Sequence, residues 1–174
     1  FPGSHQASVV TLPEGRYLAD VGCGAPILQA VPLSTTTELH HAGLGFRYQP
    51  GDTPDSLVQE RLIDGKWTSF CTYDLRPATA DGLALAFARH HTAGESWVTT
   101  TLSLVRCTPD AVYQIRNRDL SIYTDGGKRT QTLGSNAAVV DAVLATFGLP
   151  TLPVAEGLAA LERLQQAAKP GAGG

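Results

Sequence analysis

The sequence predicts an α+β fold in which an antiparallel β-barrel precedes a shorter helical region. Apolar and polar residues alternate in short runs over most of the chain, as in half-buried strands, and helical spacing occurs only near the C-terminal end. Turn residues separate neighbouring runs, so we expect the strands to pair as successive hairpins. The clearest pairs of runs are residues 7–12 with 16–20, 57–63 with 66–73, and 120–124 with 128–132. A succession of hairpins favours a closed or nearly closed barrel.

Each of these hairpins has suitable turn residues. Residues 13–15 are Pro-Glu-Gly, residues 64–65 are Asp-Gly, and residues 125–127 are Asp-Gly-Gly. Asp-Gly between two alternating runs is the strongest short hairpin signal, because glycine adopts positive φ without steric cost. Residues 97–106 and 111–116 are rich in Val, Thr and Tyr and predict two further strands.

Helices are expected only in the C-terminal part. Ser135 is a suitable N-cap, and apolar residues then recur at helical spacing until Gly148 and Pro150 end the run. A second helix is predicted over residues 154–168, where leucines recur on one face. Residues 170–174 are rich in glycine and predict a flexible tail.

Composition and charge argue against several classes of protein. The 174 residues are 43% hydrophobic, which is enough for a core, and carry a net charge of −3 with scattered basic residues. Nucleic acid is therefore not an expected partner, because no basic stripe could neutralise phosphates. No apolar run is long enough to span a bilayer and no signal-peptide pattern is present, so we expect no membrane association and a cytoplasmic protein. The chain contains no methionine, from which we expect an N-terminal portion to be missing.

Cysteines and paired histidines do not predict a metal site. The three cysteines lack C-x-x-C spacing, so neither a disulfide framework nor a zinc site is indicated. Cys71 and Cys107 lie in apolar runs, where a free cysteine usually packs as a small hydrophobic residue. His40-His41 and His90-His91 are adjacent pairs, whose side chains would point to opposite faces of a strand, so we expect surface or loop positions without metal.

His5 and Asp20 form the most informative pair in the chain. They are 15 residues apart and lie near the open end of the first predicted hairpin, which brings them side by side. A carboxylate that binds one imidazole nitrogen orients the ring and stabilises the imidazolium, so the other nitrogen can take a proton from a thiol or hydroxyl. The pair therefore predicts two members of a catalytic triad, with the nucleophile to be found elsewhere.

The same stretch resembles the arylamine N-acetyltransferases, in which a strand histidine is followed by a strand that ends in D-V-G-F-G. Here the second element is Asp20-Val21-Gly22-Cys23-Gly24, with Cys23 in the place of Phe. Residues 70–77 are similar to the aromatic strand of that family. Residues 90–104 resemble its H-x-x-S-x-F stretch, with Trp97 as the aromatic residue, and residues 136–149 resemble its lid-domain helix that ends in F-G.

The resemblance implies a cysteine-proteinase-like acetyltransferase architecture that lacks its N-terminal helical domain. Residues 1–95 would form the β-barrel domain with His5 and Asp20, and residues 96–169 an α/β lid domain. In that family the nucleophilic cysteine lies in an R-G-G-x-C type motif of the N-terminal domain, which this sequence does not contain. The expected partner is therefore an N-terminal Cys-bearing helical segment, from the same protein or from a second chain.

The resemblance also implies an activity. The complete enzyme would transfer acetyl from acetyl-CoA to its cysteine and then to a small arylamine or hydrazine. His5 would hold the cysteine as a thiolate and Asp20 would orient His5, while Cys23, Gly24 and Trp97 would line the substrate pocket. Cys23 itself is a weak candidate nucleophile, because the bond from His5 to Asp20 would direct the ring elsewhere.

Two other hypotheses remain open from the sequence. Amide synthases that close macrolactams in polyketide biosynthesis resemble these acetyltransferases and use the same triad, and Cys23 in place of Phe would suit their roomier pocket. The chain could instead be a non-catalytic binding or partner module, because its nucleophile is missing. By itself the chain is expected to be inactive.

Overall fold

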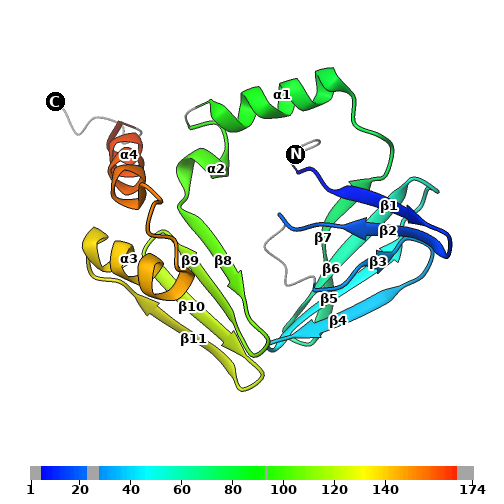
Figure 1. Ribbon diagram of the computed structural model, residues 1–174, viewed down its shortest axis with the longest axis horizontal. Coiled ribbons are helices and arrows are strands. Elements are labelled where there is room, and N and C mark those ends of the chain that lie inside the picture. The colour runs from blue at the N-terminus through cyan, green and yellow to red at the C-terminus, as the bar shows by residue number, and fades with distance from the viewer. Residues whose placement is uncertain (1–4, 23–27, 93, 168–174) are drawn as a thin grey trace.

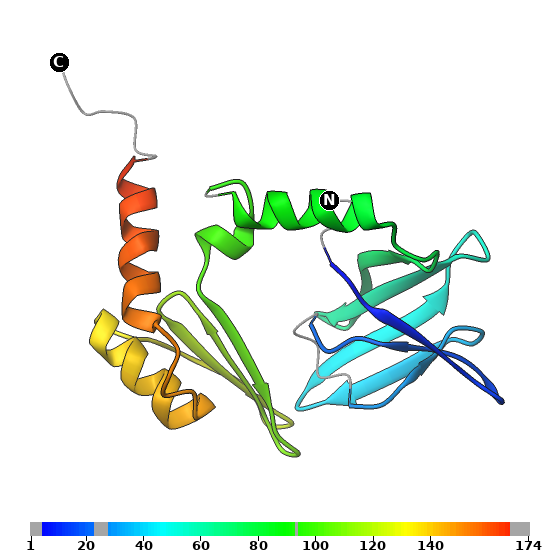
Figure 2. The ribbon, with the colours of Figure 1, turned by 45° about the horizontal axis from the view of Figure 1, so that its top comes forward.

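The computed structural model describes residues 5–22, 28–92 and 94–167, which form two β-rich halves connected by a helix (Figures 1 and 2). This agrees with the predicted α+β class. The first half contains strands β1 to β7 and the second contains strands β8 to β11 with the C-terminal helices. Each half has its own hydrophobic core.

The first half consists of two antiparallel sheets. The sheet of three strands has the order β1 (Ser8–Leu12), β2 (Gly15–Ala19) and β3 (Val31–Pro32). The sheet of four strands has the order β4 (Thr37–His41), β5 (Leu44–Pro50), β6 (Ser56–Ile63) and β7 (Lys66–Asp74). The buried core that these sheets share comprises Leu18, Val31, Phe46, Tyr48, Leu57 and Leu75.

The expected closed barrel is not formed within the described residues. The strands of the first half hydrogen-bond as two separate sheets, and β3 pairs with β2 over only two residue pairs before the first of these sheets ends. The hairpins themselves are as predicted. Asp64 and Gly65 form the two-residue turn between β6 and β7 with positive φ angles of 49° and 74°, which suit the primed turns of tight hairpins.

The second half is a four-stranded antiparallel sheet covered on one face by helices. Its strands are β8 (Ser103–Cys107), β9 (Val112–Arg116), β10 (Asp119–Thr124) and β11 (Gly127–Thr132). The covering helices are α3 (Asn136–Ala142), the π-helical turn η1 (Val143–Phe147) and α4 (Val154–Ala167). As predicted, Ser135 caps α3 through Ala138 N, and Gly148 ends the run in the left-handed conformation.

Two helices were not predicted from the sequence. Helix α1 (Ala80–His91) connects the halves, and the short α2 (Trp97–Thr100) occupies the start of a run that was expected to be a strand. None of the residues of α1 is buried, and its large apolar residues, Leu83, Leu85 and Phe87, recur at every second position, which does not single out a helix. The missed signals are local: Thr79 and Ser96 act as N-caps, and basic residues fill the last turn of α1.

The two halves touch where their hairpin turns meet. Gly43, in the turn between β4 and β5, donates its N–H to Asp125 Oδ1 over 3.1 Å. A Cβ atom at Gly43 would lie 2.7 Å from the carbonyl oxygen of Thr124, and the φ of Gly43 is +74°. Only glycine therefore allows this approach without a shift of the backbone. Among the described helices, none is long and apolar enough to cross a membrane.

Candidate active site

The first hairpin brings His5 and Asp20 into direct contact. Ser8 pairs with Ala19, so both residues lie just beyond the open end of the β1–β2 ladder. His5 Nε2 is 2.7 Å from Asp20 Oδ2, which is the hydrogen bond that the sequence predicted. The Asp20 side chain is fully buried, whereas the His5 side chain is 34% exposed. The buried partner thus holds a ring that solvent or substrate can reach.

Three hydrogen bonds hold the Asp20 carboxylate. Oδ2 accepts from His5 Nε2 and from the hydroxyl of Tyr73 at 2.8 Å, and Oδ1 accepts from the backbone N–H of Gly22 at 2.9 Å. A buried carboxylate is costly unless donors satisfy it, so this arrangement explains how Asp20 is tolerated in the interior. Sequence analysis missed Tyr73, which reaches Asp20 from β7, 53 residues away along the chain. No local pattern indicates a contact between two different sheets.

The His5 ring is confined on two sides. A Cβ atom built on Gly22 would lie 3.0 Å from His5 Cε1, so the backbone of Gly22 lies close to the edge of the ring. The ring also meets that of Tyr73 edge to face, with centroids 6.3 Å apart. Because an ionised carboxylate can only accept, Nε2 carries the proton in the neutral ring. Nδ1 is then the nitrogen that can take a proton from a nucleophile.

The structure does not connect the other predicted site residues with the pair of His5 and Asp20. Trp97 begins α2 and is 60% exposed, and among the described residues it makes no ring contact with His5. Cys23 and Gly24 lie outside the described residues. The structure therefore brings His5 and Asp20 together and does not show how Trp97 relates to them.

The two described cysteines are half-buried strand residues. Cys71 on β7 donates to Gln59 Oε1 over 3.2 Å, and burial raises the pKa of the Cys107 thiol on β8. A raised pKa disfavours the thiolate, so Cys107 lacks the character of an activated nucleophile.

The histidine pairs occupy different kinds of element. His40 and His41 lie on β4, and His90 and His91 end helix α1. His40 and His91 are exposed, as expected of surface positions, whereas His41 and His90 are half-buried. His90 Nδ1 is 2.9 Å from Ser96 Oγ, the cap of α2. Within the described ranges, no three His, Cys, Asp or Glu side chains are grouped as metal ligands would be.

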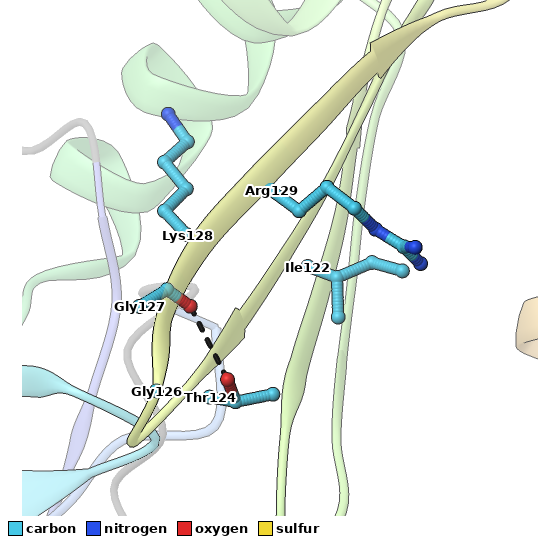
Figure 3. A pocket seen from close by; sticks show the side chains of 6 residues that line it. All are labelled: Ile122, Thr124, Gly126, Gly127, Lys128 and Arg129. Carbon is cyan, nitrogen blue, oxygen red and sulfur yellow. Dashed lines mark hydrogen bonds between the residues drawn. The ribbon is translucent and has the colours of Figure 1, made fainter.

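A shallow hollow of about 300 Å³ lies on the β10–β11 hairpin (Figure 3). Its lining includes Ile122, Thr124 and the cations Lys128 and Arg129, which project in different directions from neighbouring positions of β11. His5, Asp20 and Tyr73 do not line this hollow. It is therefore a separate surface from the histidine and carboxylate pair.

The sequence matches known acetyltransferases along most of its length. The sequence profile of the N-acetyltransferase family matches residues 1–153. An arylamine N-acetyltransferase of Mycobacterium tuberculosis (strain CDC 1551 / Oshkosh) is 29% identical over 177 residues, which cover 98% of this chain and 62% of that protein. One from Mycolicibacterium smegmatis is 29% identical over 160 residues, which cover 84% of this chain and 54% of that protein. The chain thus spans between 54% and 62% of the length of these curated relatives.

Solved structures show the same similarity. The arylamine N-acetyltransferase of Mycobacterium marinum aligns with a TM-score of 0.78 at 26% identity, over 92% of this chain and 61% of that one. A structure of the same enzyme in complex with CoA aligns with a TM-score of 0.77 at 26% identity, over the same shares of the two chains.

Proposed function

Because the chain belongs to the arylamine N-acetyltransferase family, we propose that it supplies the histidine and aspartate of a Cys-His-Asp acetyl-transfer site. The observation that carries this proposal is the 2.7 Å contact between His5 Nε2 and the buried Asp20 carboxylate. The thiol comes from a Cys-bearing helical segment outside these 174 residues, either of the same protein or of a second chain. The two halves correspond to a triad-bearing domain, residues 1–95, and a lid domain, residues 96–169.

His5 acts as the base toward that thiol. With Nε2 bound to Asp20, Nδ1 takes the thiol proton and leaves a thiolate. The thiolate attacks the carbonyl carbon of acetyl-CoA, the bond from that carbon to the CoA sulfur breaks, and CoA leaves as its thiol after taking the proton from the protonated His5. An arylamine nitrogen then attacks the acetyl-cysteine, the carbon–sulfur bond breaks, and the neutral His5 takes the amine proton. The acetylated amine leaves, and the thiolate and the protonated His5 are restored.

Asp20 orients the His5 ring and stabilises its protonated form. Tyr73 and Gly22 hold the carboxylate, so they position the pair without contacting the reacting atoms. Trp97, Cys23 and Gly24 are proposed pocket residues on the basis of the family resemblance.

The test measures acetylation by intact mass. The chain alone, mixed with acetyl-CoA, should gain no acetyl group. When it is co-expressed with the part of the M. tuberculosis relative that lies outside the match, that partner should gain one acetyl group on its cysteine. Replacing the base with His5→Gln should slow this acetylation by about 100- to 10,000-fold. His40→Gln is the matched control, because His40 is an exposed histidine on β4.

Two results would overturn the proposal. One is a stoichiometric, His5-dependent acetyl adduct on a cysteine of this chain alone, which would mean that the nucleophile is internal. The other is an equal rate for the His5→Gln assembly and the unsubstituted assembly, since the histidine would then have no part in forming the thiolate.

A further inference from the structure

Arg61 on strand β6 is a half-buried cation without a carboxylate partner. Its guanidinium carbon lies 3.4 Å from the centroid of the Phe70 ring and 5.8 Å from that of Phe46. Among the described residues Arg61 forms no ion pair, and its Nε is buried without a hydrogen-bond partner. A buried N–H donor without an acceptor is destabilising, so the unpaired Nε of Arg61 requires an explanation.

The opposite face of the same strands shows the usual solution. There Arg47 donates to Glu60 and pairs with Glu38 as well. Glu60 and Arg61 are adjacent on β6, so their side chains point to opposite faces. Arg47 thus has two carboxylate partners on its face of the sheet, whereas Arg61 on the opposite face has none among the described residues.

The ladder shows which residues share the face of Arg61. Phe46 pairs with Arg61 on one side and Thr68 pairs with it on the other, so all three lie on the same face of the sheet. A β-bulge follows, in which Gln59 and Glu60 oppose Cys71 and Ser69, and it leaves Phe70 as the extra residue. The bulge explains how Phe70 reaches over the guanidinium.

The same face carries a second buried nitrogen without a partner. His41 Nε2 makes no hydrogen bond within the described residues. His41 lies two residues after Leu39 on β4, so both side chains are on the face of Phe46, with which Leu39 pairs. Two buried nitrogens on this face, His41 Nε2 and Arg61 Nε, therefore lack a hydrogen-bond partner among the described residues.

We propose that Arg61, Thr68 and Phe70 form a binding site for a phosphate-type oxyanion. A guanidinium stacked on an aromatic ring keeps the N–H groups at its edge directed outward, in the fork geometry that matches phosphate oxygens. Thr68 is exposed and pairs with Arg61 in the ladder, and Phe70 is 50% exposed, so a ligand can reach the site from solvent. The oxyanion replaces the carboxylate that the fold does not provide.

This site is separate from the histidine and carboxylate pair. Tyr73 pairs with Leu57, and Arg61 lies four residues further along β6, which corresponds to roughly 13 Å at the usual rise of a strand. Phosphate binding at Arg61 therefore does not depend on the proposed acetyl transfer.

The test is a titration of the chain with inorganic phosphate and pyrophosphate at constant ionic strength, followed by NMR of the arginine Nε–Hε signals. Pyrophosphate should shift the Arg61 signal in a saturable manner. Arg61→Gln should weaken pyrophosphate binding by about 10- to 100-fold, as expected for lost hydrogen bonds to a charged ligand. Lys128→Gln is the matched control, because Lys128 is an exposed cation of the β10–β11 hollow (Figure 3).

Three outcomes would overturn the proposal: no saturable binding at millimolar pyrophosphate, unchanged binding by Arg61→Gln, or a loss of binding in Lys128→Gln alone. If circular dichroism shows Arg61→Gln to be unfolded, Phe70→Leu decides, because losing the aromatic platform should weaken binding about 2- to 30-fold. Competition between CoA and pyrophosphate for Arg61 identifies the anion as a phosphate group of CoA. Without competition, the ligand is a free phosphate.

Discussion

The hydrogen bond from Tyr73 to Asp20 offers a sharp test of how the site is held together. Tyr73→Phe removes only a hydroxyl, and with it a donor 2.8 Å from a carboxylate oxygen of a fully buried side chain. A hydrogen bond to a charged group contributes about 1.5–3 kcal/mol, and the remaining donors, His5 and Gly22, cannot replace it without moving. We therefore expect the free energy of unfolding to fall by about 1.5–3 kcal/mol, which corresponds to roughly 3–12 °C in Tm for a chain of this size.

Urea denaturation of a double-mutant cycle measures this contribution. The cycle compares Tyr73→Phe, Asp20→Ala and the double variant, so that losses unrelated to the contact cancel. The control is Tyr123→Phe, since Tyr123 donates over 3.3 Å to the neutral carboxamide of Gln114 and should contribute about 0.5 kcal/mol.

The expected coupling energy between Tyr73 and Asp20 is about 1.5–3 kcal/mol. If the two effects add to within about 0.5 kcal/mol, the hydroxyl does not stabilise the carboxylate. The same conclusion follows if Tyr123→Phe destabilises the protein as much as Tyr73→Phe does.

Two further predictions concern the close contact at Gly22 and the exposed carboxylate of Asp74. Gly22→Ala places a Cβ atom 3.0 Å from His5 Cε1, so the ring must shift, and acetylation in the assembled enzyme should slow by roughly 10- to 100-fold. Gly134→Ala meets no atom within 4 Å and should leave the rate unchanged; equal rates for both variants would contradict the proposed ring position. The guanidinium of Arg76 lowers the pKa of the Asp74 carboxyl to about 2, chiefly through side-chain hydrogen bonds. The pair of Asp74 and Arg76 therefore stabilises the folded protein fully at pH values above the ordinary pKa of a carboxyl group, and this stabilisation is lost as the pH falls toward 2. A midpoint near pH 4 in a ¹³C titration of the Asp74 carboxyl would contradict this prediction.

Local features of this fold could be predicted from the sequence because neighbouring residues produce them. Asp64-Gly65 forms its turn because two adjacent residues adopt positive φ, and Ser135 caps a helix whose first N–H groups are within its reach. The contact of His5 with Asp20 belongs to the same class, because a tight hairpin places the two ends of its strands together. The alternation of apolar and polar residues and the turn residues of the first hairpin were sufficient to predict this contact.

Helix α1 shows where local patterns fail. Its large apolar residues recur at every second position and none of them is buried, so the sequence does not single out a helix there, and its caps were the remaining signal. The closed or nearly closed barrel expected from the sequence is not confirmed among the described strands, for a different reason. Whether the last strand of one sheet pairs with the next depends on long-range geometry, and alternation within a strand does not specify its neighbour.

The sequence alone determined the hairpins and the pairing of His5 with Asp20, since each depends on residues within about one hairpin, and it determined the α+β class through the succession of such local patterns. Only the tertiary structure decided that Tyr73 supports Asp20 from the other sheet and that Arg61 lies beneath Phe70 without a carboxylate. Both depend on which side chains meet across separate strands, and at Phe70 on a bulge that shifts the register by one residue. Such contacts arise from the packing of elements far apart in the chain, which no short-range pattern specifies.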